Sequence, residues 1–102
     1  MRVRVELFGI PRQRAGCDQI ALDCPARDGE CTTLGQLLEQ LAYYAPALAQ
    51  GCFVRDARGA WRLSPHTIAQ VGCVFTRDPN APLEEPRDGE SSVLLLSADA
   101  GG

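Results

Sequence analysis

Apolar and polar residues alternate over residues 2–8, with the aliphatic side chains on one face and mostly charged side chains on the other. This period of two predicts a half-buried β-strand. The alternation returns over residues 17–22, which predicts a second strand antiparallel to the first. Residues 9–16 contain two glycines and a proline and predict the turn that joins the two strands.

The period then changes from two to that of a helix. Leucines at helical spacing form one apolar stripe, and Thr33 with Gln36 fits a capping box, so a helix is expected from Thr33 to about Tyr44. Pro46 limits its far end. At least one of Tyr43 and Tyr44 is expected to pack against the domain. The stripe consists of Leu34, Leu37, Leu38 and Leu41.

Two further elements and a loop are predicted in the second half. Residues 52–63 predict a small hairpin around the turn residues 56–59. Residues 68–75 predict a strand, and a charged, proline-rich loop follows with Leu83 as its single core anchor. Residues 92–96 are apolar on both faces, as expected for a strand in the centre of a sheet.

This order of elements predicts one two-layer α+β domain over residues 1–102. A mixed sheet of four to five strands packs on one main helix, and the hairpin at 52–63 is additional. The first and last strands are expected to lie side by side and parallel. Residues 97–102 would form a flexible C-terminal tail.

Composition excludes several classes of protein. The chain has 102 residues, a net charge of -3 and no lysine, so a nucleic-acid-binding surface has little electrostatic support. No apolar run reaches the roughly 20 residues that cross a bilayer. Five cysteines, an odd number without a Cys-x-x-Cys pair, argue against a zinc ribbon and against a secreted disulfide framework. With no signal sequence at the N-terminus, a cytoplasmic protein is expected.

The chain ends in Gly101 and Gly102. Because glycine lacks a Cβ, a terminal Gly-Gly is the thinnest arm that a protein can build to carry a carboxylate. Small residues are also common at frayed chain ends, so the pair is suggestive only.

Four motifs follow one another along the chain: Phe8-x-x-x-Arg12-x-x-x-Gly16, the leucine helix, the approach from Leu83 through Asp88-Gly89 to Val93, and Gly101-Gly102. In this order they resemble the ubiquitin-like β-grasp sulfur carriers of the MoaD and ThiS branches, most closely the small subunit of molybdopterin synthase. Two departures concern the molybdopterin branch, which usually has Pro-Pro where this chain has Ser97-Ala98 and asparagine where it has Gly72. Residues 93–97 also look like the ubiquitin-related modifier that serves transfer-RNA thiolation.

The resemblance implies a carrier and not an enzyme. An E1-like activating enzyme would use ATP to adenylate Gly102, and sulfur from a desulfurase or rhodanese would convert it to a thiocarboxylate. A large synthase subunit, or another sulfur-accepting enzyme, would then receive the sulfur. No cofactor or metal would be bound. Docking residues are expected at Phe8, Arg12, Arg14, Leu94, Leu96 and Ala100; the alternative is that Phe8 and the leucines are core residues and the arginines are solvated.

Two other functions remain open. The chain fits a modifier that joins target lysines through Gly102, or a β-grasp interaction module with an idle tail. Transfer RNA, thiazole or another metabolite is also open as the sulfur acceptor. His66 lacks a nucleophile motif and is expected to be a surface histidine, and Trp61 is expected to pin the hairpin.

Overall fold

In the computed structural model, residues 2–23, 33–83 and 90–98 are described. The predicted first hairpin is confirmed: strands β1 (Arg2–Leu7) and β2 (Gln19–Asp23) pair antiparallel. The connection is not a simple turn, because it contains a short helix, α1 (Ile10–Ala15). Six residues are too few for an apolar helical stripe to be visible in the sequence. The local signals are Pro11 in the first turn and Gly16, whose left-handed backbone ends the helix.

Helix α2 (Leu34–Tyr44) is the predicted main helix, and Thr33 caps it with the predicted capping box. The leucine stripe is fully buried. The prediction that a tyrosine packs was wrong, since Tyr43 is 90% and Tyr44 62% exposed. Ala42 continues the buried face instead, Tyr43 lies opposite the stripe, and Tyr44 is the last residue of the helix.

Helix α3 (Pro46–Cys52) was not predicted. Pro46 limits α2 as expected, and it also stands in the first turn of the next helix, where its missing N–H costs nothing. Leu48, Ala49 and Cys52 are buried against the core. Helix α3 therefore joins α2 and α1 in one helical layer.

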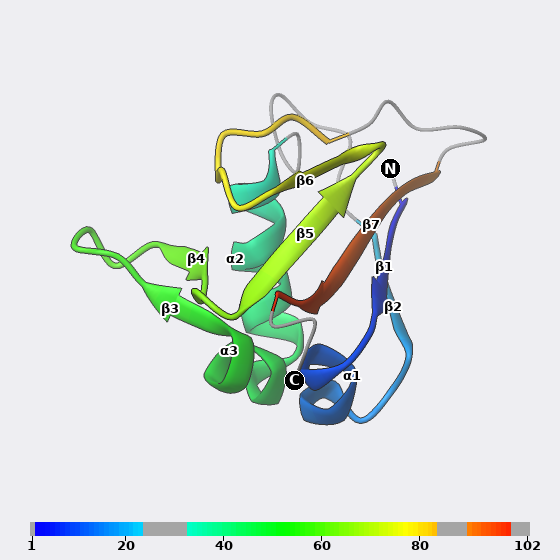
Figure 1. The fold of residues 1–102 in the computed structure, drawn as a ribbon, viewed down its shortest axis with the longest axis horizontal. Helices are drawn as coiled ribbons and strands as arrows, with labels where there is room; N and C mark the ends of the chain where they lie inside the picture. The colour runs from blue at the N-terminus through cyan, green and yellow to red at the C-terminus, as the bar shows by residue number, and fades with distance from the viewer. Residues whose placement is uncertain (1, 24–32, 84–89, 99–102) are drawn as a thin grey trace.

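The main sheet has five strands in the order β2-β1-β7-β5-β6 (Figure 1). Strand β7 (Glu90–Ser97) lies between β1 and β5 (Thr67–Val71), parallel to β1 and antiparallel to β5. The predicted central place of the last strand is thus confirmed. The predicted strand at 68–75 is divided, because β6 (Val74–Thr76) folds back on β5. Gly72 has a φ of 63° in the two-residue turn between them, a conformation that favours glycine.

The predicted hairpin is confirmed as a separate two-stranded sheet, β3 (Phe53–Arg55) and β4 (Trp61–Leu63), which extends away from the main sheet (Figure 1). Cys52 ends α3 and does not belong to it. At the base of the hairpin, Phe53 and Leu63 are buried.

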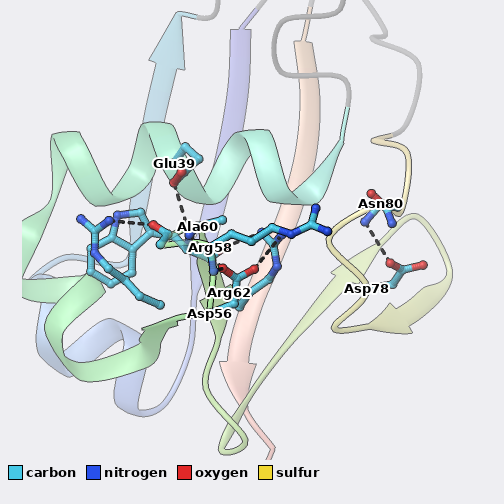
Figure 2. Close-up of polar contacts among 10 residues, drawn as sticks. Glu39, Asp56, Arg58, Ala60, Arg62, Asp78 and Asn80 are labelled. Atoms are coloured by element: carbon cyan, nitrogen blue, oxygen red, sulfur yellow. Dashed lines mark hydrogen bonds and ion pairs between the residues drawn. The ribbon is translucent and has the colours of Figure 1, made fainter.

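Polar contacts hold the tip of the hairpin together (Figure 2). The Asp56 carboxylate accepts hydrogen bonds from the amides of Arg58 and Ala60 at 2.8 and 3.0 Å, and its other oxygen lies 3.1 Å from Nη2 of Arg62. The Arg55 guanidinium lies 4.2 Å from the centre of the Trp61 ring, and this stack supports the expectation that Trp61 pins the hairpin.

A single cluster of buried side chains fills the space between the sheet and the helices. Leu83 packs against this cluster as predicted, but Ala81 does so too, and Leu83 is therefore not a single anchor. Within the described residues, no helix is long and apolar enough to cross a membrane.

Candidate functional site

Strand β7 has two apolar faces, and only one of them is covered. Val93 and Leu95 point into the core below the helices and are buried. Leu94 and Leu96 alternate with them on the opposite, open face, where they are half-buried. On the neighbouring strand, Ile68 lies directly opposite Leu96. The open face of the sheet therefore carries apolar side chains at its centre.

Two phenylalanines extend this apolar surface. Phe8 follows β1 by one residue, and its amide donates to the Leu95 carbonyl at 2.9 Å, so the strand alternation continues and places Phe8 on the open face. Phe75 lies opposite Gln70 on that face. They are 47% and 56% exposed. We call the set the open-face patch: Phe8, Ile68, Phe75, Leu94 and Leu96.

The other end of the open face is charged. Arg4 lies opposite Ser92, and its guanidinium is 4.0 Å from Glu6 and 3.6 Å from Glu90. These ion pairs are partly exposed and contribute little to stability. The charged residues border the patch at Leu94, which lies directly opposite Glu6, while Leu96 and Ile68 lie nearer the end of the sheet from which the C-terminal segment leaves.

The two predicted docking arginines lie on α1, and both are exposed. The aliphatic part of Arg14 lies over Gly51 of α3, where an added Cβ would be 2.6 Å from the Arg14 Cγ and Cδ atoms. Arg14 therefore lies against the helical layer and not on the open face. Arg12 lines a separate surface hollow with Gly9, Cys17 and other residues of the β1–β2 connection.

The last described residues, Ser97 and Ala98, form what we call the tail root. Ser97 was expected to begin the tail, but it is the final residue of β7. Its hydroxyl accepts a hydrogen bond from the Ile10 amide at 2.9 Å. The Ala98 amide donates to the His66 carbonyl at 2.8 Å. The chain is thus held on both sides as far as Ala98.

The predicted residues Ala100, Gly101 and Gly102 lie outside the described residues. His66 is exposed, as expected, and contributes its backbone carbonyl to the tail root. Sequence reasoning missed Ile68, Phe75 and Ser97. Ile68 and Phe75 are placed by strand pairing, which a single sequence does not show. Among the residues described, no group of three or more histidine, cysteine or acidic side chains is arranged to hold a metal ion.

The five-stranded mixed sheet on its main helix defines a ubiquitin-like β-grasp fold, as the resemblance implied. Neither known protein families nor curated proteins match the sequence. Solved structures do match the fold. SAMP1 from Haloferax volcanii has a TM-score of 0.70 at 20% identity and covers 100% of both chains.

Two further structures agree. The small archaeal modifier protein 1 (SAMP1) from Methanosarcina acetivorans has a TM-score of 0.68 at 21% identity, covering 99% of this chain and 96% of that one. The Haloferax volcanii HVO 2177 protein has a TM-score of 0.66 at 21% identity, covering 100% and 87%. At such low identities the likeness establishes the fold alone.

Proposed function

We propose that this chain is a sulfur carrier that forms a thiocarboxylate on Gly102 and donates the sulfur in molybdopterin synthesis. The observation that supports the proposal is the placement of β7. This strand is held between β1 and β5, carries Leu94 and Leu96 of the open-face patch and precedes the Gly-Gly terminus in the sequence. A rigid strand that ends beside a docking surface is suited to present a narrow terminal arm.

The chemistry follows from the terminal carboxylate. A carboxylate is a poor electrophile until one of its oxygens becomes a good leaving group. An E1-like enzyme would supply this by transferring AMP from ATP to Gly102 with loss of pyrophosphate. The terminal sulfur of a desulfurase or rhodanese-type persulfide would then displace AMP and form an acyl disulfide. A thiol, itself oxidised to a disulfide, would cleave the S–S bond and release the thiocarboxylate. The carrier supplies no acid, base or metal to these steps. Its contribution is to bring the terminal carbonyl to the enzyme in a defined orientation.

The open-face patch is the proposed docking surface for these enzymes. Exposed apolar patches on small proteins commonly mark interaction sites. The patch lies beside the tail root, so a partner that covers it would be placed next to the departing C-terminal segment. This arrangement makes docking and delivery of the arm parts of one event.

Intact mass spectrometry tests the proposal. The full chain is incubated with its activating enzyme, ATP, a sulfur donor and a thiol reductant, and we expect one oxygen to be exchanged for sulfur. Deletion of Gly102 should abolish the exchange. Exchange that survives this deletion, or its absence with every cognate activator, would refute the sulfur-carrier function.

The docking surface has a matched control within the chain. Leu94→Ser removes an apolar side chain from the open-face patch, whereas Val54→Ser removes an exposed one from the hairpin. The first substitution should raise the KM of the activating enzyme for the carrier, and the second should not. Equal effects of the two substitutions would contradict docking on the open face.

A protein modifier is the second candidate function, favoured by the structural neighbours that are named small archaeal modifier proteins. This chain has no lysine, so it cannot form chains linked through its own ε-amines. The last arginine is Arg87, and trypsin would therefore leave residues 88–102 on a modified lysine. A search of cell extracts for lysines that carry this remnant tests the modifier function. Its absence when the chain is fully expressed would exclude the modifier and leave the sulfur carrier as the proposed function.

The sulfur acceptor is tested by reconstitution. The thiocarboxylated chain is mixed with the large subunit of molybdopterin synthase and its precursor, or with a transfer-RNA thiolation enzyme. Sulfur transfer to the precursor supports the molybdopterin assignment, and transfer to transfer RNA alone would redirect it.

A further inference from the structure

The hydroxyl of Ser97 binds a backbone amide in the first turn of α1, a helix near the other end of the sequence. Helix α1 begins after Gly9, which has no side chain to cap it, and the amides of a first helical turn lack partners within the helix. Ser97 reaches across from the end of β7 and accepts the hydrogen bond of the Ile10 amide at 2.9 Å. The end of the last strand and the start of α1 are therefore joined by a side chain.

Gly9 is required at this junction for two independent reasons. Its φ of 66° and ψ of -132° define a conformation that is open almost only to glycine. An added Cβ would also lie 2.6 Å from the Ser97 Oγ, so any larger residue would displace the hydroxyl. The space that Ser97 occupies thus exists because residue 9 is glycine.

The other side of the tail root is held by the loop before β5. The Ala98 amide donates to the carbonyl of His66 at 2.8 Å. Arg77 braces this loop, because its Nε donates to the Thr67 carbonyl and its Nη2 to the Pro65 carbonyl, both at 3.0 Å. Helix α1 and the braced loop therefore hold the chain from two sides at residues 97 and 98.

We infer that Ser97 and Gly9 are positioning residues that fix the point where the C-terminal segment leaves the sheet. The consequence for catalysis rests on the proposed sulfur-carrier function. Four residues follow Ala98, and a fully extended segment of that length reaches about 13 Å. If the contact at Ser97 is lost, the arm starts earlier and its end samples a larger volume. The local concentration of the Gly102 carboxylate at an enzyme site then falls.

Amide hydrogen exchange tests the positioning role without any enzyme. Ser97→Ala should accelerate exchange of the Ile10 amide by about tenfold, since the lost bond is of the usual strength. Ser97→Thr keeps a hydroxyl and should restore protection. Ser92→Ala, on the same strand and exposed, is the matched control and should change nothing. Unchanged exchange at Ile10, or a parallel acceleration of the β1 amides, would overturn the inference.

Glycine variants provide a second pair. Gly9→Ala and Gly16→Ala both place alanine at a positive φ, but only Gly9 has Ser97 within contact distance of its added Cβ. Ser97→Ala should also accelerate exchange at Ala98, the next residue along the chain. Gly9→Ala should reproduce this acceleration, and Gly16→Ala should not. The same exchange at Ala98 in both glycine variants would show that backbone strain, and not displacement of Ser97, is responsible.

Adenylation kinetics with the carrier as the varied substrate give the functional readout. Ser97→Ala leaves the open-face patch intact, so KM should be unchanged and kcat should fall about three- to tenfold. A higher KM with unchanged kcat would overturn the positioning role. If the wild-type chain is not adenylated at all, the proposed function fails, and the exchange experiments alone decide whether Ser97 fixes the exit.

Discussion

Val5 of β1 and Val93 of β7 lie directly opposite each other in the only parallel pair of strands within the described residues. Both are buried, at 0% and 1% exposure. The first and last strands of the chain are therefore neighbours at the centre of the sheet. The C-terminal strand is part of the core, so a function based on the chain end depends on the stability of the whole domain.

Leu95 and Leu94 should respond differently to truncation because they point to opposite faces of β7. Leu95 is fully buried, and Leu95→Ala should lower the free energy of unfolding by about 2–5 kcal/mol. Leu94→Ala removes a half-buried side chain and should cost clearly less. Urea unfolding of both variants measures the difference. Equal losses would contradict the assignment of Leu94 to the open face.

The cap of α2 should be separable from its core contacts. Thr33 Oγ1 accepts the Gln36 amide at 3.3 Å, and the Gln36 side chain accepts the Thr33 amide at 3.2 Å. Thr33→Ala should cost about 1 kcal/mol of the free energy of unfolding, and Thr33→Ser should restore most of it. Thermal unfolding of the two variants provides the measurement. A serine variant as unstable as the alanine variant would argue against the cap.

The sequence predicted those strands and the helix in which the periodic pattern of apolar residues extends over many positions. The leucine stripe of α2, the alternation of β1 and the two apolar faces of β7 each extend over enough residues to define a period. The parallel pairing of β1 with β7 was also predicted from the order of the elements, since a parallel pair of strands requires a crossover connection such as α2.

Short elements and contacts distant in sequence were not predictable. Helices α1 and α3 span one to two turns, too few for a stripe, and each is set by a proline in its first turn together with packing. The open-face patch depends on the pairing of β5 with β7 and β6. The contact between Ser97 and Ile10 joins residues at opposite ends of the chain, and no local sequence pattern indicates that a serine and an isoleucine amide will meet.

The Asp56 carboxyl should titrate below its ordinary value. The hydrogen bond from the Ala60 amide, and then that from the Arg58 amide, lower the pKa of Asp56 from 3.8. Because the pKa is lower in the folded state, the ionised Asp56 stabilises the folded hairpin at pH values above the unfolded-state pKa. This stabilisation is lost as the pH falls through the folded-state pKa. Carboxyl ¹³C shifts, followed by NMR against pH, measure the midpoint. A midpoint at or above 3.8 would contradict the arrangement of the turn.

In the Asp56→Asn variant, the charge is removed and the side-chain oxygen is kept. The amide shifts of Arg58 and Ala60 should then lose their acid transition and keep their hydrogen-bonded positions. An acid transition that persists in this variant would show that a different carboxyl is responsible.

The Cys52 thiol should be protected in the folded protein, in contrast to the exposed Cys17 and Cys73. Burial raises the pKa of Cys52 above 9.0, although the hydrogen bond with Thr67 and the charge of Arg14 oppose this. Less thiolate and less access both slow alkylation. Labelling mapped by mass spectrometry should modify Cys17 and Cys73 first, and Cys52 only in denaturant. Equal rates in the native protein would contradict its burial.

The raised pKa of Cys52 also predicts a dependence of stability on alkaline pH. The unfolded thiol loses its proton near pH 9.0, whereas the folded thiol retains it. The folded state is therefore favoured fully below that pH and progressively less as the pH rises through the folded pKa. Urea midpoints of the wild type should fall more steeply above pH 9.0 than those of Cys52→Ala, which has no thiol to titrate at this position. Parallel slopes would show that ionisation of Cys52 is not coupled to unfolding.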